Sequence, residues 1–169
     1  MRQDEYDTLN GPAGQATTLS VLILRLGTSW LALPAQVCRE VTEMRVMHAL
    51  PHRPGRIPLG LVNIRGELQL CLKLSQLLGL EQSQEASGPV SHIAYQRLVL
   101  IEHEADRWVL LVDELTGVEH CPRTTLPETA ETATVAVRAL SSGTLTWHDT
   151  QVLCLDPEHL CAALRRELL

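Results

Sequence analysis

The chain has 169 residues and a formal net charge of −6, from 20 acidic and 14 basic residues. Apolar residues make up 45% of the chain, enough to build a core, which excludes a disordered protein. The acidic balance and an aromatic content of 3% argue against a basic or base-stacking surface for nucleic acids. The length accommodates one domain, or two small subdomains that share a core.

The first half of the chain predicts a polar tail over residues 1–17, followed by short strands. Apolar runs on either side of Gly27 indicate a hairpin, and a proline-rich loop follows the third strand. The predicted elements are strands over Leu19–Leu26 and Ser29–Leu33, a helical turn over Ala35–Val41 and a strand over Met44–Leu50.

The stretch from Leu59 to Leu80 shows the clearest periodicity. Leucines alternate with other residues over eight positions, which predicts a half-buried strand whose leucines face the core. The inward set is Leu68, Leu70, Leu72 and Leu74, and the outward set is Glu67, Gln69, Cys71 and Lys73. Ser75 then caps a short helix that Gly79 ends. Before the strand, Gly66 allows a backbone conformation that other residues resist.

The second half follows a similar plan after a polar linker at about 81–95. Asp156-Pro157-Glu158 marks the start of a C-terminal helix, because it combines a capping Asp, a proline at the first position and an acid in the first turn. The predicted strands are Arg97–Ile101, Arg107–Val112, Thr116–His120, Val135–Leu140, Leu145–Trp147 and Gln151–Leu155.

Segments of the two halves resemble each other. Trp30 in SWLALPAQV corresponds to Trp108 in RWVLLVDEL, and Cys71 in LCLKLSQLL corresponds to Cys154 in LCLDPEHLC. Both halves place a hairpin first and a strand followed by a helix last. We interpret this as an internal duplication, with a barrel-like subdomain at about 18–80 and a second at about 96–169. Chance similarity between β segments is the alternative.

The motif around Arg65 resembles the signature of the CheW family, the coupling proteins of bacterial chemosensory systems. That signature is roughly G-v-x-N-L-R-G-x-x-x-P-V-x-D-L, and the matching residues are Gly60, Val62, Asn63, Arg65, Gly66 and Leu74. Leu70 stands where the family usually has proline, and Lys73 where it usually has aspartate. The runs Cys38–Val41 and Leu110–Val118 extend the resemblance over about Thr18–Leu164. The chain also resembles the CheW-like subunits of Wsp-type surface-sensing pathways.

This resemblance implies a mainly β fold of two five-stranded SH3-like barrels with short helices, including a C-terminal helix. It implies a non-catalytic, cytoplasmic adaptor that is recruited to membrane-bound receptor arrays. The adaptor would couple the cytoplasmic hairpin of a methyl-accepting chemoreceptor to the regulatory domain of a CheA-like histidine kinase. It would need no cofactor or metal, bind no nucleic acid and not insert into the membrane.

By the same resemblance, a receptor-binding groove lies between the subdomains. Its predicted residues are Cys38, Glu40, Arg65, Val109, Leu115 and Val118, and the structural motif beside it is Gly60, Asn63 and Gly66. The residues alone leave alternatives open. Val109, Leu115 and Val118 equally suit a core, and Arg65 could brace its turn by bonding backbone carbonyls.

Two other functions remain as alternatives: a β-barrel peptide-binding module outside chemosensing, and an enzyme with a site at the subdomain junction. The chain has no P-loop, GxSxG or GxGxxG motif, which disfavours the enzyme. Pro51 between His48 and His52 disfavours a helical metal site. Five cysteines without a CxxC pair predict free thiols in a reducing compartment. We expect neither a secretory signal nor a membrane span.

Overall fold

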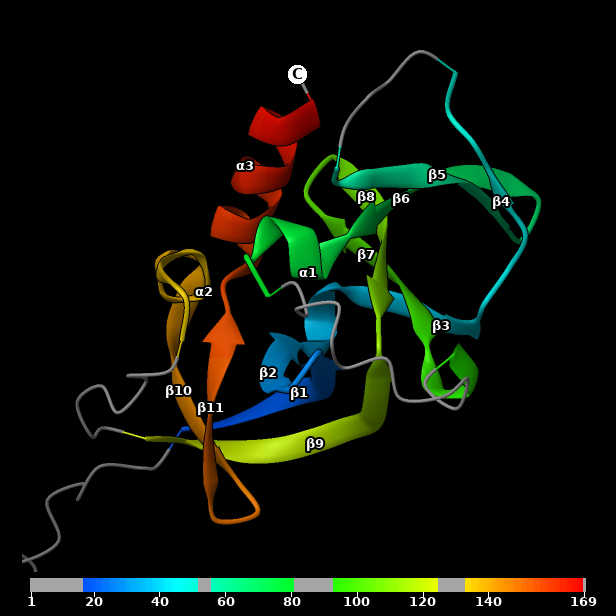
Figure 1. The fold of residues 1–169 in the computed structure, drawn as a ribbon. Helices are drawn as coiled ribbons and strands as arrows, with labels where there is room; N and C mark the ends of the chain where they lie inside the picture. The colour runs from blue at the N-terminus through cyan, green and yellow to red at the C-terminus, as the bar shows by residue number, and fades with distance from the viewer. Residues whose placement is uncertain (1–16, 52–55, 81–92, 125–132, 169) are drawn as a thin grey trace, which may run out of the picture.

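The structure is a computed structural model that describes residues 17–51, 56–80, 93–124 and 133–168. Two β-sheets lie side by side, one closed into a five-stranded barrel and the other six-stranded (Figure 1). Short helices and a longer C-terminal helix pack beside them. The predicted fold class, mainly β in two subdomains with a C-terminal helix, is confirmed.

The barrel has the strand order β1-β2-β11-β10-β9, and the second sheet has the order β3-β7-β8-β6-β5-β4. The barrel strands are β1 (Thr18–Leu26), β2 (Ser29–Pro34), β9 (Glu114–Thr124), β10 (Ser141–Trp147) and β11 (Thr150–Leu155). The second sheet contains β3 (Cys38–Glu43), β4 (Met47–His48), β5 (Pro58–Ile64), β6 (Glu67–Lys73), β7 (Arg97–His103) and β8 (Asp106–Val112). The helices are α1 (Leu74–Leu77), α2 (Val135–Ala139) and α3 (Pro157–Leu168), with 3-10 turns at η1 (Ala35–Val37) and η2 (Ile93–Tyr95).

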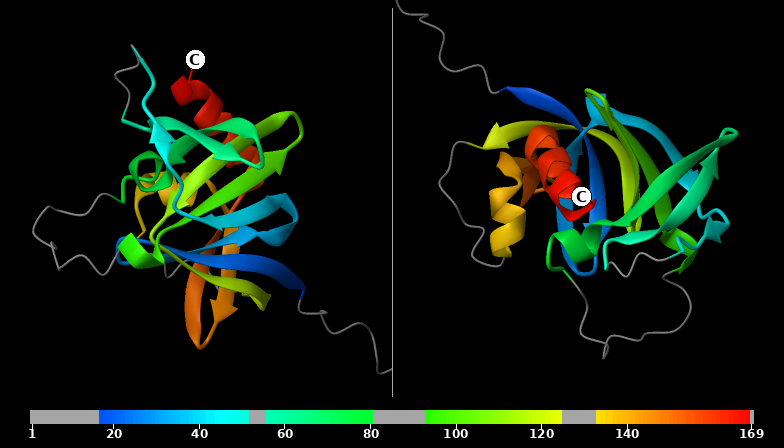
Figure 2. Two further views of the ribbon diagram at one scale, coloured as in Figure 1. Left: turned by 90° about the vertical axis from the view of Figure 1, so that its right-hand side faces the viewer. Right: turned by 90° about the horizontal axis from the view of Figure 1, so that it is seen from above.

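Each sheet takes strands from both halves of the chain (Figure 2). β11 pairs in parallel with β2, and β6 pairs in parallel with β8, so the last strand of each half joins the hairpin of the other half. The sheets therefore do not correspond to the expected subdomains at 18–80 and 96–169. Only Thr17 of the expected tail and Ile93–Tyr95 of the expected linker fall within the described residues.

The two halves nevertheless occupy equivalent places in the two sheets. Gly60 lies opposite Cys71 next to a bulge in the β5–β6 pair, and Gly143 lies opposite Cys154 next to a bulge in the β10–β11 pair. Trp30 and Trp108 likewise follow the turns of the corresponding hairpins β1–β2 and β7–β8. The repeated sequence pattern thus matches a repeated topology whose units are exchanged.

Three apolar clusters hold the sheets together. The barrel interior is filled from strands such as β1 and β11, for example by Ile23 and Val152, and the interior of the second sheet includes Leu98 and Val109. The largest cluster lies between the sheets and takes side chains from both of them and from α3, including Leu24 and Leu110. This central cluster makes the two sheets one folding unit.

Strands next to the central cluster are buried on both faces. In β1, residues 21–24 are all buried, because Val21 and Ile23 point into the barrel while Leu22 and Leu24 point into the central cluster. A strand buried on both faces shows a continuous apolar run rather than alternation. The same arrangement applies to β6 and changes the prediction made for it.

The prediction of a half-buried β6 is wrong at three positions. Leu72 is fully buried in the central cluster as expected, but Leu68 is 60% exposed because it lies next to the β5–β6 turn. Gln69 and Cys71, expected to face solvent, are buried, and Cys71 fills the interior of the second sheet.

Other local predictions also differ from the structure. Ser75 does not cap α1, which begins at Leu74 and has no side-chain cap. Val135–Leu140, predicted as a strand, forms α2, because the Thr134 hydroxyl accepts a hydrogen bond from the Val137 N–H at 3.2 Å and caps a helix. The predicted turn over Ala35–Val41 is helical only in η1 and continues as β3. Of the strand expected over Met44–Leu50, only the two residues of β4 form a strand.

α3 begins where the sequence predicts, with Asp156 accepting a hydrogen bond from the His159 N–H at 3.0 Å. Leu160 and Leu164 bury one face of the helix in the central cluster. Arg165 pairs with Asp106 of β8 at 3.3 Å, which fastens the helix to the second sheet. No helix among the described residues is long and apolar enough to cross a bilayer.

We predict that Leu72→Ala lowers the free energy of unfolding by about 2–5 kcal/mol, since it leaves a cavity in the central cluster. Leu68→Ala, on the same strand but 60% exposed, is the matched control and should cost less than about 0.5 kcal/mol. Urea denaturation followed by circular dichroism measures both. Equal midpoints for the two variants would show that Leu72 is not buried in the central cluster.

The cysteines generate a second prediction. All five are free thiols, four of them buried and Cys38 half-buried. Burial raises the pKa of the Cys38 thiol to about 12, so the reactive thiolate is scarce at pH 8 and its reactivity should increase with pH. Denatured, unreduced protein should react with five equivalents of a thiol reagent, whereas the folded protein should react slowly. A stable shortfall of two or four equivalents in the denatured protein would reveal a disulfide or a bound metal.

Candidate functional site

The β5–β6 turn presents Arg65. Ile64 pairs with Glu67, so Arg65 and Gly66 alone connect the strands, and their φ angles of +52° and +86° are those of a tight hairpin turn with a left-handed backbone. The Gly66 N–H donates to Asn63 Oδ1 at 2.8 Å and fastens the turn. A positive φ suits glycine but costs an arginine about 1–2 kcal/mol. Strain of this kind accumulates where a side chain has a role.

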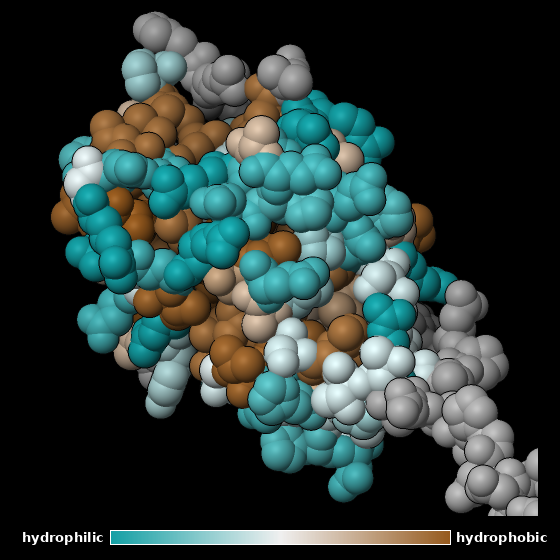
Figure 3. All heavy atoms as spheres, turned by 180° about the vertical axis from the view of Figure 1, so that it is seen from behind, coloured by the Kyte–Doolittle hydropathy of each residue, from teal (hydrophilic) through white to brown (hydrophobic). Residues whose placement is uncertain are grey.

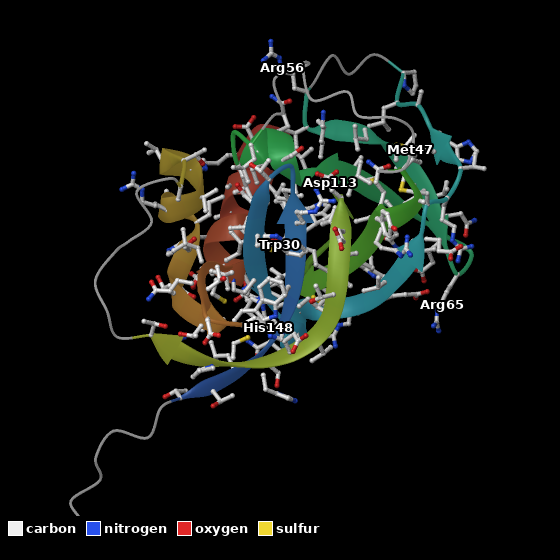
Figure 4. The ribbon with its side chains drawn as sticks, turned by 60° about the horizontal axis from the view of Figure 1, so that its bottom comes forward. Trp30, Met47, Arg56, Arg65, Asp113 and His148 are labelled. Atoms are coloured by element: carbon white, nitrogen blue, oxygen red, sulfur yellow. The ribbon has the colours of Figure 1, made fainter. Side chains whose placement is uncertain are left out.

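Arg65 forms an ion pair with Glu40. The Arg65 Nε lies 2.7 Å from Glu40 Oε2, and the arginine side chain is 82% exposed while the glutamate is 20% exposed. Figure 4 shows Arg65 pointing out from the body of the protein. An ion pair this exposed contributes about 0–1 kcal/mol to stability. The contact is with a carboxylate, so the geometry differs from the brace on backbone carbonyls that the sequence left open.

Further ion pairs run across the strands next to this turn. Arg39 of β3 pairs with Glu102 of β7 at 3.5 Å, Arg107 of β8 approaches Glu102 at 3.8 Å, and Arg107 also pairs with Glu67 of β6 at 2.7 Å. These charges follow the strand order β3-β7-β8-β6. The end of the second sheet that carries Arg65 is therefore covered by alternating charges.

A bulge in β3 separates two of the predicted groove residues. Cys38 pairs with Ile101 and Glu40 with Leu100, which makes Arg39 an extra residue in the strand. Ile101 belongs to the central cluster and Leu100 to the interior of the second sheet, so Cys38 and Glu40 belong to opposite faces. Cys38 packs against the central cluster, whereas Glu40 reaches Arg65.

The predicted groove residues from the second half of the chain also lie in different places. Val118 is opposite Leu22 and Leu115 opposite Leu24, which places both on the barrel face that turns toward the second sheet. Val118 is 60% exposed, and Leu115 is half-buried against the central cluster. Val109 is fully buried inside the second sheet, so it does not line a surface.

Val41 belongs with the exposed apolar residues, although it is not one of the predicted groove residues. It pairs with Val99 of the central cluster, so it projects from the sheet face that turns toward the barrel, yet it is 40% exposed. Its position at the end of the run Cys38–Val41 was the available signal. Figure 3 shows that apolar side chains gather across the middle of one face and over its second-sheet end.

Arg56 does not contribute to this site. It precedes β5 while Arg65 follows it, and the seven residues of that strand span roughly 23 Å. Figure 4 shows the two arginines at opposite ends of β5. We expected arginines of the proline-rich loop to make the surroundings of Arg65 basic, but Arg56 does not do so. Arg53 lies outside the described residues.

Two hollows on the described surface lie away from the predicted groove residues. One of about 360 Å³ opens between the starts of β2 and β11, lined by Trp30, Val137 and Val152 among others. Another of about 420 Å³ lies beside the start of α3, near Ser20 and Arg123. Neither is lined by the predicted groove residues. The described residues hold no group of three or more side chains suited to bind a metal ion.

The sequence matches the model of the CheW-like domain over residues 20–165. The chain belongs to the CheW-like domain family. The crystal structure of the scaffolding protein TtCheW from Thermoanaerobacter tengcongensis superposes with a TM-score of 0.62 at 18% identity, covering 83% of this chain and 90% of that one. This likeness confirms the fold. A search of curated proteins found no significant match.

The glycines of the family motif give a matched pair of variants. A Cβ at Gly60 would lie 2.5 Å from the His48 carbonyl oxygen and 2.8 Å from Met47 Cγ, whereas a Cβ at Gly66 meets nothing within 4 Å. Both have positive φ angles. We predict that Gly60→Ala costs about 2–4 kcal/mol and Gly66→Ala about 1–2 kcal/mol in unfolding free energy. Thermal denaturation ranks them; a more stable Gly60→Ala than Gly66→Ala would contradict the packing of β4 on β5.

Proposed function

We propose that this CheW-like protein is a non-catalytic adaptor that couples a methyl-accepting chemoreceptor to a CheA-like histidine kinase. The family match supports a scaffold role in chemosensory signalling. The solved relative, named a scaffolding protein, shares the fold. Recruitment to membrane-bound receptor arrays and service in a Wsp-type pathway are finer parts of the same proposal.

The observation that carries the receptor contact is the strained, exposed Arg65. A guanidinium presented on a rigid two-residue turn can hold a carboxylate or helix-end carbonyls with directional hydrogen bonds. Glu40 approaches Nε, which favours one orientation of the arginine before a partner arrives. Because that ion pair is exposed and weak, a receptor carboxylate can compete for the guanidinium at little cost.

Apolar contact would come from the sheet faces that meet at the central cluster. Val41 and Val118 are the exposed members, with Leu115 and Cys38 half-buried next to that cluster. An amphipathic helical hairpin binds such a surface with its apolar face and places its polar side chains at the rim. The kinase regulatory domain would occupy a different β-barrel face, so that one adaptor holds both partners.

We predict that Arg65→Glu weakens binding of a receptor cytoplasmic fragment at least thirtyfold, since it puts a second carboxylate beside Glu40. Affinity for the kinase regulatory domain should stay unchanged. Isothermal titration with each purified partner measures both constants, and circular dichroism reports the fold. Arg56→Glu makes the same charge change on an exposed arginine at the other end of β5 and should bind the receptor normally.

Arg65→Asn separates recognition from folding. Asparagine tolerates the left-handed backbone, so this variant should be as stable as the parent or more stable while still losing receptor affinity. Normal receptor binding by both Arg65 variants would place the receptor surface elsewhere on the protein. Equal losses of receptor affinity for Arg56→Glu and Arg65→Glu would show that the change in net charge, and not the position of Arg65, causes the loss.

A further inference from the structure

The chain crosses between the two sheets at two places within the described residues. After β2, η1 leads into β3, and after β8, Asp113 alone leads into β9. Pro34, at the first crossing, lies opposite Val21 of β1, and Glu114, at the second, lies opposite Arg25 of β1. The two crossings are therefore separated by four residues measured along β1, roughly 13 Å. Together with the central cluster, these two connectors set the angle between the sheets.

The crossing at Asp113 is held by its own side chain. One oxygen, Oδ2, accepts a hydrogen bond from the Gly27 N–H at 2.6 Å, in the turn of the β1–β2 hairpin. The Asp113 N–H donates to the Arg25 carbonyl at 3.0 Å. The residue that directly follows the second-sheet strand β8 is thereby bonded twice to the barrel, and Figure 4 shows Asp113 at this junction.

Arg25 orders the barrel side of the same junction, through contacts within the barrel. Its Nε lies 2.9 Å from Glu114 Oε2, its terminal nitrogen donates to the Gly27 carbonyl at 2.7 Å, and its guanidinium stacks 5.9 Å from the Trp30 ring centre. The arginine side chain is only 15% exposed, so its bonds are less screened by solvent than those of the surface ion pairs. Arg25, Gly27, Asp113 and Glu114 form what we call the crossover clamp.

The crossover clamp lies on the strands that carry the proposed receptor surface. Beyond it, β9 runs through Leu115 to a bulge at Thr116–Gly117, where Gly117 has a φ of +105°, and then to Val118. Val41 lies on β3, in the other sheet. A rotation of one sheet against the other would change the spacing between Val41 and Val118 without disturbing either strand pairing.

We infer that Asp113 is a positioning residue that sets the angle between the two sheets and thereby the spacing of the receptor surface. The inference rests on the proposed function only for its link to the receptor. The mutual orientation of the sheets is a property of the free protein and can be measured without a partner.

The test compares Asp113→Ala, which removes the acceptor for the Gly27 N–H, with Asp113→Asn, whose amide oxygen can replace it. Residual dipolar couplings, recorded on the full chain, report the orientation of each sheet separately. In the parent and in Asp113→Asn, one alignment tensor should fit both sheets. In Asp113→Ala, the couplings of each sheet should still fit the structure of that sheet. The orientation of one sheet relative to the other should differ from that in the parent protein.

Titration of a receptor cytoplasmic fragment should show about a tenfold loss for Asp113→Ala and recovery in Asp113→Asn. An unchanged orientation in folded Asp113→Ala overturns the inference, as does a changed orientation with parental receptor affinity. If Asp113→Ala does not fold, Asp113→Ser, whose hydroxyl oxygen lies one bond closer to the backbone than the carboxylate oxygen, is measured against the same criteria. If the parent protein binds neither the receptor fragment nor the kinase regulatory domain, the proposed function is rejected, and the orientation measurement stays valid.

Discussion

The layer of leucine and valine side chains between the two sheets is the constraint on which the rest of the structure depends. Phenylalanine is absent from the chain, so this layer is built from aliphatic side chains supplied by β1, β2, β6, β7, β8 and α3. Neither sheet could bury its facing surface alone, because the apolar side chains on that face would be left in water. The central cluster therefore joins two small β units, each with its own modest interior, into one domain.

The same layer explains which parts of the fold could be predicted from the sequence. Turns and caps are local, and the hairpin around Gly27 and the capped start of α3 were predicted correctly. The duplication was visible because Cys71 and Cys154 repeat in matching contexts. The exchange of strands between halves was not predictable, since β6 and β11 have similar sequences and either could pair with β2 or β8. Which pairing forms depends on the tertiary packing of the whole chain.

Burial on two faces also removes the signal used to orient a strand. The alternation in β6 predicted a core face and a solvent face, yet Cys71 and Leu72, on opposite faces, are both fully buried. The Cys38–Glu40 bulge has a similar consequence at the candidate site, because spacing of two in a sequence implies one face only when the strand is regular. Arg65 was identified from its motif, but its Glu40 contact depends on a meeting of β3 with the β5–β6 turn that sequence cannot specify.

A receptor-binding adaptor needs rigid surfaces with a defined separation, because ordering a mobile surface on binding lowers affinity. Arg65 meets this requirement locally: its two-residue turn is fastened by Asn63, and Glu40 orients its guanidinium. The apolar residues Val41 and Val118 lie on different sheets, so their separation is fixed only through the contacts that join the sheets. The central cluster resists sliding and rotation of the sheets through its close packing, without directional bonds. Directional bonds are added where the chain crosses between the sheets, and Asp113 supplies them at the crossing that has no helical turn of its own.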